Sequence, residues 1–308
     1  MKTFLIIGVD SVVGANLAAS WSEQTRVIGL SSGAPVSISG CERATVERSS
    51  LDGFRKCLQQ TRATHVIFCG SAAKSSWESP AKSGDDANAE LWAIATAELG
   101  LHFTLISSDA VFSGPWMFHN ETSQTICRSA EAKAIREIEA RVQAACPNSL
   151  IVRTNAFGWS PSGSKNGWLE SLISALENNK AIELDPICHS TPILASDLAD
   201  YLEPVLEDEL AGVFHIAGAE RVSPHGFARQ LAATLELAAP TQRTIRELES
   251  RPSGFGRGET SLQTKRFRSE YECSMPMLSD GLQRLVQQQQ SGYRDRLAGK
   301  AIRTGKAA

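Results

Sequence analysis

Short apolar runs alternate with longer helix-like segments through the first half of the chain. The predicted strands are residues 4–7, 26–30, 65–69, 102–106 and 150–153, and the predicted helices between them are residues 12–21, 87–99 and 129–145. The strand runs do not alternate between apolar and polar positions, which favours parallel strands covered on both faces. This order predicts an α/β fold, a doubly wound parallel sheet of the Rossmann type, with ligands at the carboxyl ends of its strands.

The pattern loosens after about residue 158. A Ser/Pro/Gly-rich loop at 160–164 precedes predicted helices at 168–177, 196–206 and 224–237 and one further strand at 212–216. We therefore expect a nucleotide-binding domain over residues 1–159, to which some later segments return. We expect a smaller C-terminal substrate lobe over 160–286 and a flexible, solvated tail over 287–308.

Composition narrows the class of protein. The 308 residues are 42% hydrophobic and 21% charged with a net charge of −3, which is ordinary for a soluble globular protein and shows no global bias toward nucleic acid or anionic membrane. The seven cysteines are scattered without a C-x-x-C pair, so reduced thiols are expected and no metal site is predicted. No run approaches the ~18–20 apolar residues of a membrane span. A cytoplasmic protein is expected.

The first strand runs into a turn that resembles a dinucleotide-binding motif. The pattern Gly-x-x-Gly-x-x-Gly is met at its first and last positions, Gly8 and Gly14, while Ser11 stands at the middle one. The middle glycine lets the backbone approach a pyrophosphate, so a Cβ there narrows the approach, although a serine hydroxyl can also hydrogen-bond a phosphate. The following helix N-terminus at Val12 offers N–H groups and a positive dipole. A weak nucleotide site is predicted.

The end of the second strand bears on the choice of cofactor. Dinucleotides with a free ribose 2′-hydroxyl usually meet Asp or Glu there. Here Leu30 is followed by Ser31 and Ser32, which are able to accept a 2′-phosphate. The residues favour NADP over NAD, and a nucleotide site that has been lost altogether stays open as the alternative.

Five segments carry a family resemblance. Residues 106–114 read Ile-Ser-Ser-Asp-Ala-Val-Phe-Ser-Gly, close to Ile-Ser-Thr-Asp-Tyr-Val-Phe-Asp-Gly, and residues 87–89, 152–158, 191–199 and 212–218 match further motifs in order. Together they resemble the dTDP-4-dehydrorhamnose reductase family of extended short-chain dehydrogenase/reductases, over nearly the whole chain to about Leu285. The resemblance implies an NADP-dependent reductase fold acting on a nucleotide-linked 4-keto sugar.

The same resemblance implies roles for single residues, and one of them is missing. Ser108 takes the place of the Ser/Thr that holds the substrate oxygen, and Asn88 that of the asparagine that supports the site. Lys133 takes the place of the lysine that grips the nicotinamide ribose, although a surface lysine paired with Glu137 explains it equally. The tyrosine that protonates the substrate is replaced by Ser129. An aliphatic hydroxyl is a far poorer acid than a phenol with a pKa of about 10.

Two functions follow as alternatives. The first, which the missing tyrosine favours, is a ligand-binding or regulatory protein with a nucleotide-sugar-like ligand and a protein partner or a second copy of the chain. The second is an active oxidoreductase or other sugar-nucleotide enzyme with a substitute acid. Neither involves nucleic acid or a membrane. Besides the turn residues, Arg153 is counted as cofactor-binding, and the candidates on the substrate side are His119, Cys188, His189 and Thr191.

Overall fold

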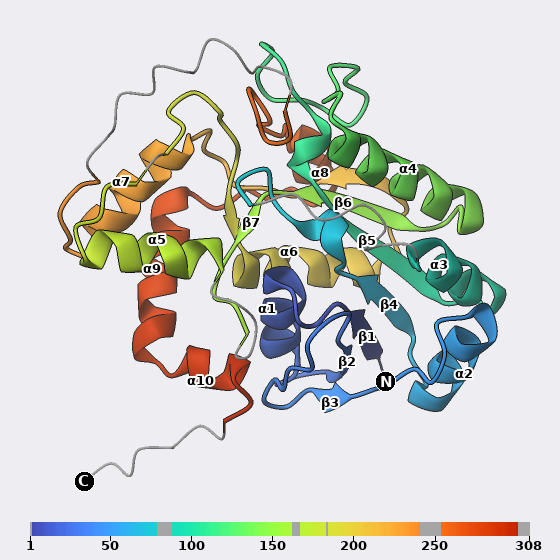
Figure 1. Cartoon of the computed structure of the whole chain (residues 1–308). Helices are drawn as coiled ribbons and strands as arrows, with labels where there is room; N and C mark the ends of the chain where they lie inside the picture. The colour runs from blue at the N-terminus through green and yellow to red at the C-terminus, as the bar shows by residue number, and fades with distance from the viewer. Residues whose placement is uncertain (1, 79–87, 162–166, 183, 241–253, 301–308) are drawn as a thin grey trace, which may run out of the picture.

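Seven parallel strands form one sheet in the computed structural model, which describes residues 2–78, 88–161, 167–182, 184–240 and 254–300 (Figure 1). Its order is β3-β2-β1-β4-β5-β6-β9, and every neighbouring pair is parallel. The strands are β1 Thr3–Ile7, β2 Arg26–Leu30, β3 Glu42–Arg43, β4 His65–Phe68, β5 His102–Ser108, β6 Leu150–Thr154 and β9 Gly212–His215. The predicted doubly wound sheet is confirmed.

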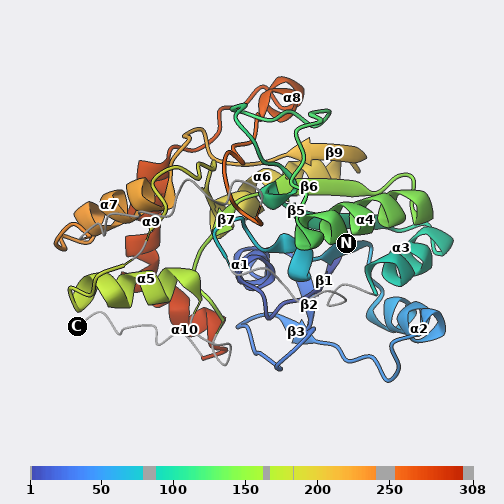
Figure 2. The same ribbon diagram turned by 45° about the horizontal axis from the view of Figure 1, so that its top comes forward.

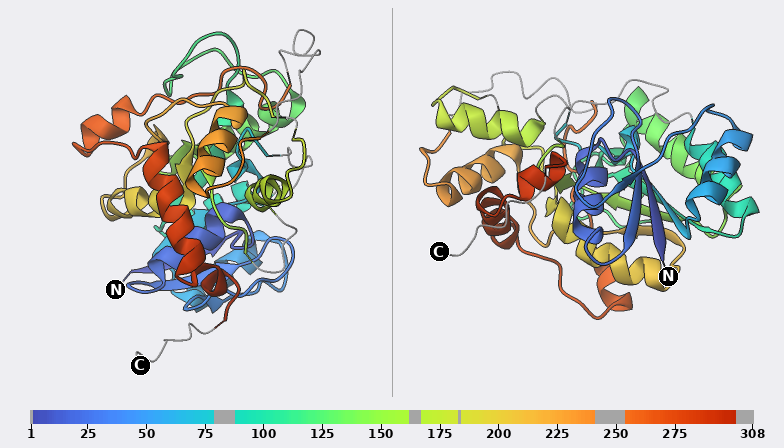
Figure 3. Two further views of the ribbon diagram at one scale, coloured as in Figure 1. Left: turned by 90° about the vertical axis from the view of Figure 1, so that its left-hand side faces the viewer. Right: turned by 90° about the horizontal axis from the view of Figure 1, so that it is seen from below.

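Helices cover both faces of this sheet (Figures 1 and 3). One face carries α2 Leu51–Thr61, α3 Ala89–Glu98 and α4 Ala130–Ala145, and the other carries α1 Val12–Trp21 and α6 Ala195–Glu207. Strand β1 shows why residues 4–7 are all apolar. Phe4 and Ile6 enter the core on the α1 side, while Leu5 and Ile7 enter the core on the α2 side. Successive side chains of a strand point to opposite faces, so a strand buried on both needs no polar position.

A smaller C-terminal lobe lies beside the sheet (Figures 1 and 2). It contains α5 Trp168–Glu177, α7 Pro224–Thr234 and α9 Leu278–Gln290, with a two-stranded sheet of β7 Ala156–Phe157 and β8 Ile193–Leu194 at its base. Its aromatic centre joins Trp77, Trp168 and Phe227, with ring centroids 5.3–5.5 Å apart. Because Trp77 follows β4, this packing fixes the lobe to the sheet domain.

The flexible tail expected from residue 287 is incorrect for residues 287–300. Helix α9 continues to Gln290, and α10 Tyr293–Leu297 follows it and packs on α1. The Tyr293 hydroxyl donates to the Asn16 side-chain oxygen at 3.1 Å, and Arg296 forms an ion pair with Glu23 at 2.6 Å. These contacts return the C-terminal segment to the first domain. The basic residues from 301 onward lie outside the described residues.

Two further structural facts bear on the sequence expectations. All seven cysteines lie in described segments, and none of them is joined in a disulfide. Across the described residues, every helix falls short of the length and hydrophobicity that a bilayer-spanning segment requires. The remaining elements are the short helix α8 Lys265–Glu270 and the 3₁₀ turns η1 Ser71–Ala73 and η2 Asp109–Val111.

Candidate dinucleotide site

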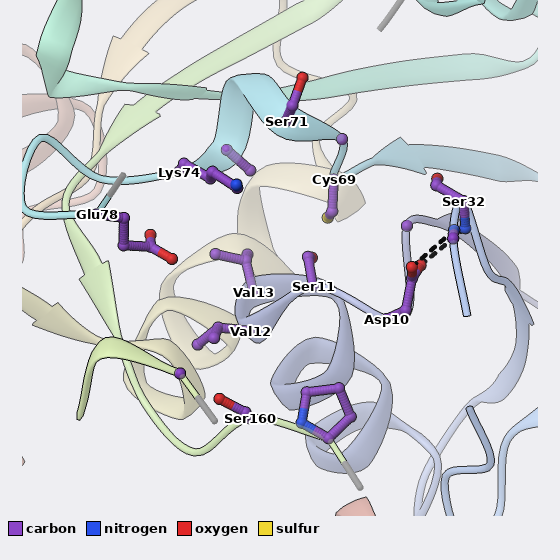
Figure 4. A pocket seen from close by; sticks show the side chains of 16 residues that line it. Asp10, Ser11, Val12, Val13, Ser32, Cys69, Ser71, Lys74, Glu78 and Ser160 are labelled. Atoms are coloured by element: carbon purple, nitrogen blue, oxygen red, sulfur yellow. Dashed lines mark hydrogen bonds between the residues drawn. The ribbon is translucent and has the colours of Figure 1, made fainter. Parts of the chain in front are cut away.

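A cavity of about 520 Å³ opens at the carboxyl ends of β1, β2 and β4 (Figure 4). This is the place where open parallel sheets bind ligands, and the volume falls in the range of small-molecule sites. Of the predicted cofactor-binding residues, the cavity is lined by Gly8, Ser11, Val12 and Ser32. The opposite wall comes from Ser160 and Pro161, at the start of the loop that leads to the lobe.

The two glycines of the turn are required by close backbone approach. Gly8 has φ +82°, and a Cβ on it would lie 2.2 Å from the Cys69 carbonyl oxygen. A Cβ on Gly14 would lie 2.3 Å from the Gly8 carbonyl oxygen. Side chains are therefore excluded at both positions, and α1 starts tightly against β1 and β4 as a dinucleotide-binding turn demands.

Ser11 has a structural role that the sequence did not reveal. It is the N-cap of α1, and its hydroxyl accepts the Gly14 N–H at 2.9 Å. The first N–H groups of a helix are the donors that a bound phosphate would use. The Ser11 side chain thus uses one of those donors and places its own Cβ at the wall of the cavity.

Two substitutions separate these effects of Ser11. We expect Ser11→Gly to tighten NADH and NADPH binding by about tenfold, because it frees the Gly14 N–H and removes the Cβ. The stability cost is only a few tenths of a kcal/mol, since glycine is a tolerated N-cap. Ser11→Ala frees the N–H but keeps the Cβ. Calorimetric titration of the three proteins then assigns the gain to the donor or to the space, and equal affinity in all three would show that Ser11 does not limit binding.

The loop after β2 is tied to the phosphate turn by a residue that sequence reasoning missed. The Asp10 carboxylate accepts the Ser32 N–H at 2.7 Å and the Gly33 N–H at 2.8 Å (Figure 4). Ser31 is used differently, since its hydroxyl accepts the Val36 N–H at 3.3 Å and does not line the cavity. A carboxylate is therefore present at the end of β2, but the β1–α1 turn supplies it.

Ser108 is the last residue of β5, is fully buried, and is held by its neighbours. Its hydroxyl accepts the Ala110 N–H at 3.0 Å and lies 3.3 Å from a carboxylate oxygen of Asp109. Asp109 is itself the centre of a buried hydrogen-bond network. Its carboxylate accepts bonds of 2.5–2.9 Å from side chains or backbone of Ser76, Asn155, Ser190 and Thr260.

The other two residues that align with the reductase motif, Ser129 and Lys133, lie at the start of helix α4 and within it. Ser129 is its N-cap and accepts the Ala132 N–H at 3.2 Å. The Lys133 side chain is 69% exposed and its ammonium group lies 3.6 Å from the Glu137 carboxylate, the surface pair considered as the alternative. Neither residue lines the cavity.

The two remaining predicted site residues near the sheet are also placed elsewhere. Arg153 forms a buried two-point ion pair with Glu139, at 2.9 and 2.7 Å, and lies over the Phe112 ring. Asn88 stands at the N-cap of α3, where its side chain makes no capping hydrogen bond. The phosphate-turn residues Gly8, Ser11 and Val12 therefore line one cavity, and the residues at the catalytic positions do not line it.

A segment from the far end of the chain occupies the region between α4 and the loop after β4. Phe255 packs against an apolar cluster that includes Ala72 of η1, Val111 of η2 and Ile135 of α4. The Cys127 thiol lies 3.6 Å from the Gly254 carbonyl oxygen. A Cβ on Gly256 would lie 1.9 Å from the Ser76 carbonyl oxygen, so this segment touches the backbone after β4 directly. Phe255 and the Gly254 backbone therefore lie against the side chains of Ile135 and Cys127.

The substrate-side candidates do not gather around the cavity. His119 is buried against Phe112, with ring planes 4° apart, and burial lowers its pKa below the usual value. The Cys188 thiol lies 2.7 Å from the Asp185 carboxylate, and burial together with that carboxylate raises its pKa to about 12. A thiol with that pKa is a poor nucleophile near neutral pH. None of the four candidates lines the cavity.

The other two candidates, His189 and Thr191, also have partners within the chain. An imidazole nitrogen of His189 lies 2.5 Å from the Ile187 carbonyl oxygen, and the buried Thr191 hydroxyl accepts the Leu262 N–H at 3.1 Å. Each of the four candidates is thus held by neighbouring groups of the chain outside the cavity.

Besides Asp10, two further ionisable residues in the cavity were not predicted from sequence. Lys74 and Glu78 follow η1, and both side chains line the cavity (Figure 4). Glu78 accepts the Ser75 N–H at 2.9 Å, and desolvation raises the pKa of its carboxyl group above the usual value. The family motifs do not mark these positions, and only their place after a buried strand could have suggested them.

Comparisons with solved structures agree with this architecture. A dTDP-4-dehydrorhamnose reductase from Bacillus anthracis in complex with NADP is 17% identical, with a TM-score of 0.76 over 94% of this chain and 100% of that one. A dTDP-4-dehydrorhamnose reductase from Clostridium acetobutylicum is 18% identical, with a TM-score of 0.74 over 94% and 100%. The Bordetella bronchiseptica enzyme WbmH in complex with NAD⁺ is 13% identical, with a TM-score of 0.72 over 97% and 100%. At these identities the likeness shows the fold.

Sequence comparison supplies the family. No curated protein sequence matches the chain significantly. The family model described as the RmlD substrate binding domain matches residues 1–291, which is nearly all of the 308 residues. With that match and the sheet, lobe and phosphate turn described above, the chain belongs to the RmlD substrate-binding domain family.

Proposed function

We propose that this protein binds a pyridine dinucleotide and a nucleotide-sugar-like ligand, and that it acts as a binding or regulatory protein rather than as an efficient reductase. One observation carries the proposal. The cavity above Gly8 and Gly14 is retained, whereas Ser108, Ser129 and Lys133 are each engaged outside it. Function depends on the site more than on the fold, so the reductase fold alone does not imply reduction.

The described residues fit a dinucleotide. The turn at Gly8 and the start of α1 at Val12 would hold the pyrophosphate through backbone N–H groups and the helix dipole. Ser160 and Pro161 would close the far side. When bound, such a cofactor supplies a hydride, but reduction also needs a proton donor at the substrate oxygen. Ser129, which caps α4, does not provide one. The proposal therefore predicts that the protein binds the dinucleotide without efficient reduction of a substrate.

Calorimetric titration with NADH and NADPH tests the proposal. We expect saturable binding of one ligand per chain with a Kd above about 1 µM, because Ser11 narrows the turn and uses one of its donors. The matched variant is Lys133→Met. A reductase-type site would lose affinity because that lysine grips the nicotinamide ribose, whereas the proposed site changes by less than about twofold. The absence of saturable binding, or a large loss in Lys133→Met, would contradict the proposal.

The pair of Lys74 and Glu78 favours a second function, an active sugar-nucleotide enzyme. In that enzyme a residue of the cavity would act as the general acid in place of the tyrosine of the reductase motif. Glu78 combines a place in the cavity with a raised pKa, the features of a carboxyl general acid. Slow conversion of a dTDP-4-dehydro sugar in the presence of cofactor, detected by mass spectrometry and lost in Glu78→Gln, would support this function. Conversion absent in both proteins would leave the binding role, whereas equal conversion in both would show an enzyme whose acid is not Glu78.

The regulatory role also requires a partner, either another protein or a second copy of the chain, in the cytoplasm. That part of the proposal rests on the lost reductase geometry alone. Copurification with the cofactor-loaded protein, compared with the cofactor-free protein, would identify such a partner. A partner whose recovery is independent of cofactor would argue against regulation through this site.

A further inference from the structure

Asp10 places a carboxylate where the adenosine ribose of a dinucleotide is expected. It lies in the turn between β1 and α1, and its two oxygens accept the backbone N–H groups of Ser32 and Gly33 at 2.7 and 2.8 Å (Figure 4). All three residues line the cavity together with Gly8 and Ser11. In dinucleotide-binding folds a carboxylate near the end of the second strand receives the ribose hydroxyls, and an arginine nearby accommodates a 2′-phosphate.

The geometry leaves this carboxylate able to accept further hydrogen bonds. An ionised carboxylate has about four lone-pair sites, and the two backbone bonds use one on each oxygen. The remaining sites suit a ribose 2′-hydroxyl, which donates one hydrogen bond. Gly33 adds to the fit, because a Cβ there would lie 3.1 Å from an Asp10 oxygen and crowd the same space.

A 2′-phosphate on the ribose is disfavoured at this position. It carries negative charge, and it would lie next to the Asp10 carboxylate, whose repulsion disfavours it. The N–H groups of Ser32 and Gly33, which would otherwise be donors for a phosphate, are already bonded. Among the described lining residues the only Lys or Arg is Lys74, which lies on the other side of Ser11 from Asp10 (Figure 4).

Resting on the dinucleotide site proposed above, we infer that Asp10 makes the cavity select NAD(H), with its free ribose 2′-hydroxyl, against the 2′-phosphorylated NADP(H). This inference reverses the preference expected from Ser31 and Ser32. That expectation considered only the residues that follow Leu30, whereas folding brings the deciding carboxylate from the preceding turn.

Calorimetric titration of the full chain with NADH and with NADPH tests the inference. In the unmodified protein we expect NADH to bind at least about tenfold more tightly. Asp10→Asn keeps the size of the side chain and one acceptor oxygen but removes the charge, and it should reduce the NADH-to-NADPH preference by at least about tenfold. Glu42→Gln is the control, because it removes a carboxylate from the neighbouring strand β3, outside the cavity lining, and should leave the preference unchanged.

The outcomes separate this inference from the proposed function. Equal or tighter binding of NADPH by the unmodified protein would overturn the role of Asp10 while leaving the dinucleotide site intact. An unchanged preference in a folded Asp10→Asn variant would do the same. Where that variant fails to fold, the comparison of ADP-ribose with its 2′-phosphorylated form on the unmodified protein decides, and tighter binding of the phosphorylated form would overturn the inference. No saturable binding of any of these ligands would overturn the inference and the proposed function together.

Discussion

Ser129→Tyr is expected to leave reduction of dTDP-4-dehydrorhamnose at least ~10²-fold below the ordinary enzyme range of ~1–10³ s⁻¹. The phenol alone does not assemble a site. Lys133 is 69% exposed and paired with Glu137, and the Ser108 hydroxyl is buried against the Ala110 N–H. This differs from what the family resemblance implies, namely that Ser108 holds the substrate oxygen and Lys133 the nicotinamide ribose. Steady-state oxidation of NADH or NADPH measures the rate.

Ser129→Ala is the matched control for that experiment. Both substitutions remove the N-cap of α4, at a cost of about 1 kcal/mol of stability, but only one adds a phenol. Turnover near ~1 s⁻¹ in the tyrosine variant and none in the alanine variant would contradict the account. It would show that Lys133 and Ser108 reach the cofactor, and that a missing acid alone limits reduction by the unmodified protein.

Asp109→Asn is expected to destabilise the protein by about 3 kcal/mol, a large part of the stability of an ordinary domain. The Asp109 carboxylate is fully buried and accepts hydrogen bonds from Ser76, Asn155, Ser190 and Thr260. These donors come from four segments, so the network joins the loop after β4 to the lobe. An amide accepts at only one of its two positions and turns a donor toward the other hydroxyls.

Denaturant unfolding followed by circular dichroism measures that loss. Ser190→Ala, which removes one donor and leaves the carboxylate with its other partners, should cost about 1 kcal/mol. If Asp109→Asn costs no more than Ser190→Ala, the network is not the junction between sheet and lobe that its geometry indicates.

The hydrophobic pattern predicted most of the sheet because its buried parallel strands contain short continuous apolar runs, such as residues 4–7 of β1. Strands β1 and β2 and helices α1 and α5 were placed within one residue of their observed bounds. Helix α2 was missed because most of its residues are polar and only Phe54, Cys57 and Leu58 are buried. Helix α9 was partly mistaken for a tail because of its glutamines, although Leu278, Leu282 and Leu285 form an apolar stripe at helical spacing.

The parts of the candidate site that depend on local sequence were predicted. The parts that depend on tertiary contacts were missed. Gly8 and Gly14 are recognisable because their turn is a local motif. Asp10 was missed, since nothing in the sequence shows that its carboxylate reaches the loop after β2. The packing of Phe255 between η1 and α4 joins positions far apart in the chain, and no local pattern reveals it.

A single-turnover experiment tests the central claim most directly. Protein in excess is loaded with NADH, dTDP-4-dehydrorhamnose is added, and the nicotinamide absorbance and fluorescence are followed together. The account predicts that fluorescence reports bound NADH throughout while the absorbance stays constant over many minutes, because the cavity above Gly8 holds the cofactor and Ser129 and Lys133 lie outside it. Oxidation of the bound NADH at ~1 s⁻¹ or faster would contradict the account.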